Sequence, residues 1–134
     1  MLPQAKHIVL VSFAFPVHAP HTVFGGQADQ LEASVEKSGI PFTILRLPLF
    51  TDNTINYAAT VKSQNKFYSA TRPDAPFSTI AVSDVGDAAA VVLAQPAKHA
   101  GKKYLLASRP WTNQELAGIL TKFINLPGKT VRDP

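Results

Sequence analysis

The sequence predicts an α/β fold built on a parallel sheet. Short, continuous runs of β-branched and other apolar residues recur along the chain, as in strands that are covered on both faces. Segments with a helical spacing of apolar residues separate these runs. The chain has 134 residues, of which 46% are hydrophobic and 16% charged. We therefore expect a single globular domain over residues 1–134, with room for one modest core.

The first three expected elements are a strand, a helix and a second strand. His7–Phe13 is the first apolar run and Phe42–Leu47 is the second. Between them, Val23–Lys37 has helical spacing, and Gly39 ends this helix because glycine adopts the left-handed conformation without a steric penalty. Two parallel strands joined by a helix form a βαβ unit with a right-handed crossover.

The expected helix over 23–37 has one apolar stripe. Ala28, Leu31 and Val35 recur at helical spacing, which predicts the face that packs against the sheet. This pattern predicts that the polar residues lie largely elsewhere on the helix: Gln30, Glu32, Glu36 and Lys37.

The middle of the chain has a less regular pattern. Asn53–Gln64 is compatible with a helix over the sheet edge. Lys66–Ala70 and Phe77–Val82 are predicted as short strands. Arg72–Asp74 forms the turn between them, because proline and aspartate favour turn conformations.

A helix composed mainly of residues with small side chains is expected next. Ser83 can cap its first free amides, and Asp84 and Asp87 lie where the positive end of the helix dipole favours acids. The body Ala88–Ala94 suits close packing on a sheet, and Pro96 ends the helix.

The last part of the chain predicts a third strand and a final helix. Lys103–Ser108 has the composition of a buried strand. Thr112 and Glu115 form a capping box, in which each side chain satisfies a free amide at the helix start. The apolar stripe of this helix is Leu116, Ile119, Leu120, Phe123 and Ile124, and Pro127 and Gly128 end it.

Composition excludes several classes of function. There is no cysteine, which removes disulfides, thiolate nucleophiles and cysteine-type zinc sites. The net charge of +4 comes from scattered lysines and arginines without a basic stripe, which argues against direct nucleic-acid binding. No run approaches the ~20 apolar residues of a membrane span, and the N-terminal residues do not resemble a signal peptide. We expect a soluble, cytoplasmic protein.

Three segments, in this order and spacing, cover nearly the whole chain. The first joins VFGGQ at 23–27 and Glu32 to SGIPFTILRLPLFTDN at 38–53. The second is IAVSDVGDAA at 80–89, and the third joins KYL at 103–105 to WTNQEL at 111–116. Together they resemble the C-terminal half of an NmrA-like protein of the atypical short-chain dehydrogenase/reductase superfamily.

This resemblance implies a partial Rossmann-like, doubly wound parallel sheet that holds NAD(P) across the carboxyl ends of its strands. In that family, the loop that follows the strand matching residues 42–47 of this chain approaches the nicotinamide. The matching loop here is Pro48, Leu49 and Phe50, with Asn53 close behind. Ser12 matches the polarising serine of the superfamily only roughly. In the alternative interpretation Ser12 and Pro48 merely end strands, and Phe50 only packs.

The N-terminal Gly-rich βαβ half of the family is not evident in this sequence. That half begins with a G-x-x-G-x-x-G turn, whose backbone amides meet the pyrophosphate. The seven glycines never have that spacing after a strand: Gly25, Gly26, Gly39, Gly86, Gly101, Gly118 and Gly128. We expect the first three strands of the family's sheet to be absent, which weakens NAD(P) binding. The chain is then a natural short form, a truncated gene product or a protein completed by another chain.

The catalytic positions also depart from the superfamily's pattern. Active members use Tyr and Lys four residues apart, where Tyr transfers a proton and Lys lowers its pKa and holds the ribose. The matching positions here are Phe24 and Ala28, which cannot transfer a proton. Gln27 lies near them, but an amide is neither acid nor base at neutral pH. Hydride-transfer catalysis is therefore not expected.

Other constellations have structural explanations. His18 and His21 have an H-x-x-H spacing, but Pro16 and Pro20 place them in a loop without a neighbouring carboxylate, so we predict no metal site. No serine lies in a G-x-S-x-G elbow, so a hydrolase triad is not supported. Trp111 is expected in the core or in an interface.

Two functions remain open from the sequence. The first is a non-catalytic NmrA-like regulatory or protein-binding module with weak or absent NAD(P) affinity. It would act through a surface made from the sheet edge left exposed by the strand that starts at His7 and from the C-terminal helix, as a homo-oligomer or with a protein partner. The second is part of an NAD(P)-dependent oxidoreductase that is active only with the dinucleotide-binding half present.

Overall fold

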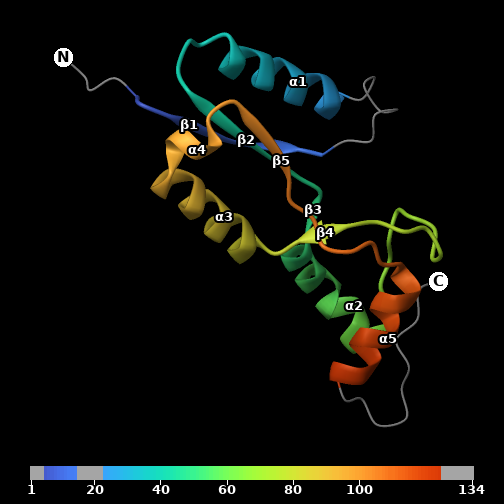
Figure 1. The fold of residues 1–134 in the computed structure, drawn as a ribbon. Coiled ribbons are helices and arrows are strands. Elements are labelled where there is room, and N and C mark those ends of the chain that lie inside the picture. The colour runs from blue at the N-terminus through green and yellow to red at the C-terminus, as the bar shows by residue number, and fades with distance from the viewer. Residues whose placement is uncertain (1–4, 15–22, 125–134) are drawn as a thin grey trace. The chain divides into compact units, whose positions relative to one another are not determined.

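A computed structural model describes residues 5–14 and 23–124. The chain has an α/β fold and divides into two compact units. One contains the residues up to Phe50 together with Ile80–Ala107, and the other contains Thr51–Thr79 and the residues from Ser108 onward. The order of the helices and strands along the chain can be followed in Figure 1.

The first unit is built on a three-stranded parallel sheet. Its strands are β1 (Ile8–Phe13), β2 (Phe42–Leu47) and β5 (Lys102–Leu105), in the order β1-β2-β5. Ile8 is paired with Phe42, and Thr43 with Lys102. Strand β2 is central and is the most buried of the three, which agrees with its mainly apolar sequence. The predicted parallel sheet is confirmed.

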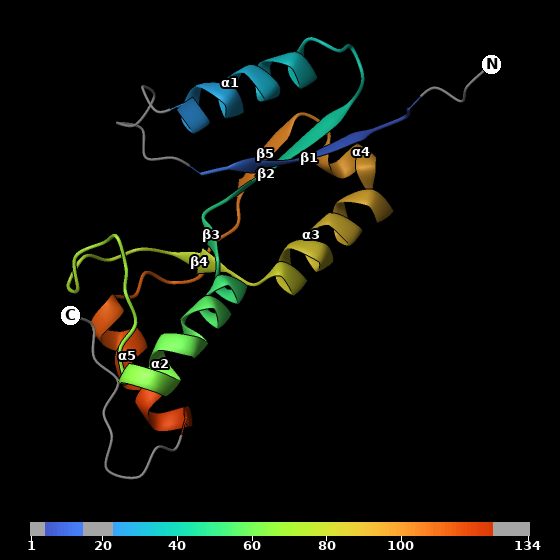
Figure 2. The ribbon, with the colours of Figure 1, turned by 180° about the vertical axis from the view of Figure 1, so that it is seen from behind.

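Helices cover both faces of this sheet (Figures 1 and 2). Helix α1 (Val23–Glu36) lies on one face. Helix α3 (Val82–Ala94) and the short helix α4 (Pro96–His99) lie on the other. Gly39, just after α1, has a φ of 74°, the left-handed conformation that the sequence predicted.

The core of the first unit lies between the sheet and α3. Alternate residues of each strand point to opposite faces, so the α3 side of β2 supplies the core residues. The buried cluster is Leu45, Leu47, Ile80, Val85 and Val92, with Val9, Phe50, Ala89, Tyr104 and Leu106 packed against it. The small side chains of α3 allow this close approach to the sheet.

The second unit is helical. It contains the 3₁₀ helix η1 (Thr51–Tyr57), helix α2 (Ala58–Gln64) and helix α5 (Asn113–Ile124). Its buried cluster is Val61, Phe67, Leu116 and Ala117, with Tyr57, Trp111 and Leu120 packed against it. The predicted helical segment over 53–64 is confirmed, although its first half is a 3₁₀ helix and it belongs to the second unit and not to the unit that contains the sheet.

The capping box at the start of α5 is confirmed. The Thr112 amide donates to Glu115 Oε2 at 2.8 Å, and the Glu115 amide donates to Thr112 Oγ1 at 3.2 Å. Each side chain therefore satisfies a backbone amide that the helix leaves free. Asn113 is buried, and its side-chain Nδ2 donates to Thr71 Oγ1 at 2.8 Å, which anchors the preceding loop to the helix.

Two predicted strands in the middle of the chain were wrong or too long. Lys66–Ala70 is not a strand, and Phe67 is instead buried in the core of the second unit. Of the predicted strand Phe77–Val82, only β4 (Thr79–Ile80) forms, and it pairs with β3 (Leu49–Phe50). The turn at Arg72–Asp74 is confirmed by the hydrogen bond from the Ala75 amide to the Arg72 carbonyl.

Helix α3 begins earlier than the sequence predicted. Its N-cap is Ala81, which has extended backbone angles and makes no side-chain cap. Ser83 therefore lies inside the first turn and is not the cap, whereas Asp84 does lie in the first turn as expected. Helix α3 ends at Ala94, and Pro96 starts α4, where its missing N–H costs nothing.

Some sequence-based predictions lie outside the described residues. These include the loop with Pro16, His18, Pro20 and His21, and the helix end at Pro127 and Gly128. Among the helices that the structure describes, none is both long and apolar enough to cross a membrane.

Candidate functional site

The carboxyl ends of β1, β2 and β5 lie at one edge of the first unit's sheet, because the three strands are parallel. Pro48, Leu49 and Phe50 follow β2 at this edge. Leu49 is 65% exposed, whereas Phe50 packs against the core cluster. Leu49 therefore presents its side chain to solvent at this edge, whereas the backbone of Leu49 and Phe50 forms strand β3, which pairs with Thr79–Ile80.

Ser12 lies near the end of β1 and is buried. Its hydroxyl donates a hydrogen bond to Glu32 Oε1 at 2.8 Å. A serine that polarises a substrate carbonyl must present this hydroxyl to the substrate. In this chain the hydroxyl proton is directed into the protein, toward a carboxylate of helix α1.

Glu32 connects helix α1 to all three strands of the sheet. Its carboxylate accepts hydrogen bonds from Ser12 on β1 and from Arg46 on β2, at 3.0 Å from Nε and 2.6 Å from Nη2. Lys103 Nζ on β5 lies 3.3 Å from Oε2 and also forms an ion pair with Glu36. The two-pronged Arg46 contact has the geometry in which guanidinium binds carboxylate most strongly.

The predicted packed face of helix α1 was wrong at two positions. Glu32 was predicted to lie largely away from the packed face of α1, but it is only 4% exposed. Leu31, expected on the packed stripe, is 49% exposed. The buried face of α1 consists of Gly25, Ala28 and Glu32, because the sheet offers cations to this helix instead of a purely apolar surface.

The environment keeps Glu32 ionised. The hydrogen bonds from Arg46 are the largest cause that lowers the pKa of Glu32, from its ordinary value of 4.5 to about 2. Burial acts in the opposite direction, while the Ser12 hydroxyl and Lys103 add to the lowering. In turn, Glu32 raises the pKa of Arg46, and Glu36 is the main cause that raises the pKa of Lys103. The cluster is therefore charged at neutral pH.

Two residues of α1 were expected, from the resemblance in sequence, to occupy the positions of a catalytic Tyr and Lys. Phe24 is 67% exposed in the first turn, and Ala28 is buried against the sheet. Gln27 is exposed. None of these three side chains can donate a proton at neutral pH.

The remaining candidate residue is Asn53, and the remaining question is whether the described residues contain a metal-binding group. Asn53 is exposed and lies in η1 of the second unit. Within residues 5–14 and 23–124, no group of three or more His, Asp or Glu side chains could hold a metal ion.

Comparison with solved structures shows which fold this is. The chain superposes on a nucleoside-diphosphate-sugar epimerase from Staphylococcus aureus with a TM-score of 0.81 at 20% identity, covering 96% of this chain and 44% of the epimerase. This is a Rossmann-like, NAD(P)-binding fold. The chain matches its C-terminal part.

Two reductases are more similar in sequence. An NADPH-dependent quinone oxidoreductase from Escherichia coli is 30% identical, with a TM-score of 0.79, over 96% of this chain and 45% of the oxidoreductase. A triphenylmethane reductase from Citrobacter sp., solved with NADP(H), is 28% identical, with a TM-score of 0.76, over 96% of this chain and 44% of the reductase. The chain thus spans less than half the length of these Rossmann-like proteins. No protein-family model matches it.

Sequence reasoning missed the Glu32 cluster, although a signal for it was present. Arg46 lies between Leu45 and Leu47 in the middle of an otherwise apolar strand. A charged residue in a strand covered on both faces requires a partner of opposite charge. The helix packed on that strand offered Glu32 as such a partner.

Proposed function

We propose that this chain is a non-catalytic, NmrA-like regulatory or protein-binding module that binds NAD(P) weakly or not at all. The observation that carries this proposal is the state of the catalytic positions. Phe24 and Ala28 stand where a proton donor and its lysine would be, and the Ser12 hydroxyl is directed to Glu32. In this proposal the chain keeps part of an NAD(P)-binding fold, but the side chains at positions 24 and 28 cannot transfer a proton to a substrate.

The position of β1 at the end of the described strand order supports a role in protein binding. Strand β1 pairs with β2 on one side, and no described strand pairs with its other side. Val11 is 48% exposed and Phe13 is 57% exposed. An edge strand with exposed apolar side chains is a template for another chain. The partner in this proposal is a second copy or another protein that supplies a strand.

In the second candidate function, this chain is one part of an NAD(P)-dependent oxidoreductase. It is favoured by the 30% identity to the NADPH-dependent quinone oxidoreductase from Escherichia coli. Under this hypothesis the loop Pro48, Leu49 and Phe50 of the first unit, with Ser12, would contact NAD(P) once a dinucleotide-binding half is present.

Thermal unfolding with and without NADPH distinguishes the two. A ligand raises the melting temperature only if it binds the folded state. We expect a cooperative transition that NADPH does not shift, and no NADPH oxidation with quinones. A clear rise in melting temperature would refute weak or absent binding and favour the oxidoreductase hypothesis.

Sedimentation of two variants tests the proposed edge. Val11→Lys places a charge on β1, which should reduce self-association or capture of a strand-donating partner. Leu105→Lys is the matched control, because Leu105 is an exposed apolar residue of β5. Equal loss of association in both variants would contradict a specific role for β1.

A further inference from the structure

The second unit contains a cavity that the proposed function does not use. Its volume is about 380 Å³, and it lies between η1, α2 and Leu120 of helix α5. Sites for small molecules have volumes of roughly 300–1,000 Å³. All of its lining residues belong to the second unit, so the cavity is defined within one compact body.

The lining is mainly apolar and continuous with the core. Val61 is 1% exposed and Leu120 packs against the same buried cluster. Ala58 leaves space between them, since its side chain is a single methyl group. Ile55, which also lines the cavity, is 74% exposed. A large apolar side chain left in water favours an apolar ligand that covers it.

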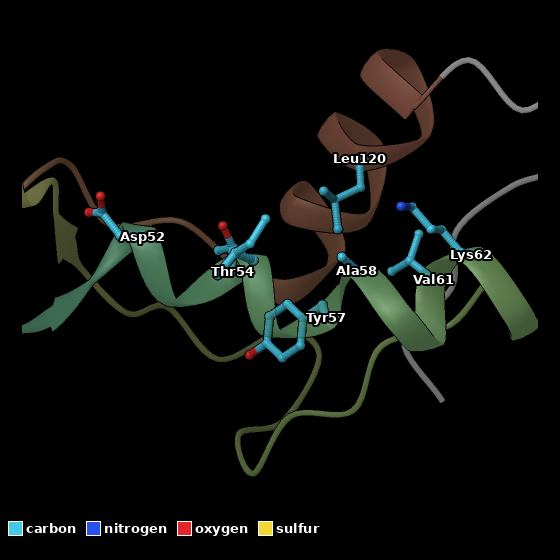
Figure 3. A pocket seen from close by; sticks show the side chains of 8 residues that line it. Asp52, Thr54, Tyr57, Ala58, Val61, Lys62 and Leu120 are labelled. Atoms are coloured by element: carbon cyan, nitrogen blue, oxygen red, sulfur yellow. The ribbon is translucent and has the colours of Figure 1, made fainter.

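Opposite charges lie at the two ends of this cavity. Figure 3 shows Asp52 at one end and Lys62, beside Leu120, at the other. Within the described part of the chain, Lys62 has no hydrogen bond or ion pair. An apolar surface with a single available cation at one end is complementary to an amphipathic anion.

We propose that this cavity binds an apolar monocarboxylate. Its carboxylate pairs with Lys62, and its hydrocarbon part lies along Ala58 and Ile55. Asp52 repels a carboxylate, which fixes the orientation of the ligand. This binding is independent of NAD(P) and of the β1 edge.

Calorimetric titration of the protein with decanoate tests this proposal. Removing one solvent-accessible ion pair should weaken binding by about two- to fivefold, so we expect that increase in the Kd of decanoate for Lys62→Gln. Lys66→Gln is the matched control, because it removes the same charge from a residue outside the lining. Decanol has the same chain without the charge, and its Kd should be equal in the wild type and Lys62→Gln.

A second variant tests the place of binding. Ala58→Leu fills the cavity and should abolish decanoate binding, while the amide NMR spectrum shows that the fold is kept. The proposal is overturned if decanoate does not bind the wild type, if Lys62→Gln and Lys66→Gln bind it equally, or if Ala58→Leu binds it unchanged. The proposal is also overturned if the protein forms a dimer that covers the cavity and if added decanoate does not dissociate that dimer.

Discussion

The Glu32 cluster gives the sharpest test of the structure. Glu32→Gln keeps the shape of the side chain and its ability to accept from Ser12, but removes the charge that Arg46 and Lys103 require. Lowering the pKa of Glu32 from 4.5 to about 2 corresponds to about 3 kcal/mol of folding stability. The side chains of Arg46 and Lys103 are 41% and 36% exposed, so water screens part of this interaction. We expect Glu32→Gln to lose about 2 kcal/mol.

The pH dependence separates this charge effect from a general packing defect. The folded-state pKa of Glu32 is depressed, so its contribution is fully present above pH 4.5 and is lost as the pH falls toward 2. Urea unfolding of the wild type and the variant should therefore differ at pH 7 and converge between pH 4.5 and 2.

A control variant removes the outer acid of the same cluster. Glu36→Gln breaks the ion pair with Lys103, but the Glu36 side chain is 40% exposed, so the loss should be about 0.5 kcal/mol or less. The reasoning is refuted if Glu32→Gln costs no more than Glu36→Gln at pH 7. It is equally refuted if the difference from the wild type persists unchanged at pH 2.

Three further predictions concern stability and can be measured by urea unfolding followed by circular dichroism. Thr112→Ala removes one half of the capping box and should cost about 1 kcal/mol, whereas Thr112→Ser should restore most of it. Gly39→Ala meets no neighbouring atom but forces a φ of 74° on a residue with a Cβ, so we expect a loss of about 1 kcal/mol. Phe67→Ala empties a fully buried site beside Tyr57 and should cost about 3–5 kcal/mol; a loss near zero would contradict the core of the second unit.

Local sequence signals determined much of the fold. The apolar runs of β1 and β2, the glycine after α1 and the Thr112–Glu115 capping box each act over a few residues, so the sequence predicted them correctly. The parallel sheet followed from the order of strands and helices. The resemblance to NAD(P)-binding reductases also rested on local motifs, and it indicated the C-terminal part of the fold that the solved structures match.

Tertiary structure alone decided the features that depend on residues far apart in the chain. Glu32 is buried because Ser12, Arg46 and Lys103 on three strands converge on it, and helical periodicity contains no information about these partners. Phe67 leaves an expected strand because the helical core of the second unit takes up its ring. The cavity beside Lys62 exists because helix α5, some 60 residues later in the sequence, supplies Leu120 to one of its walls.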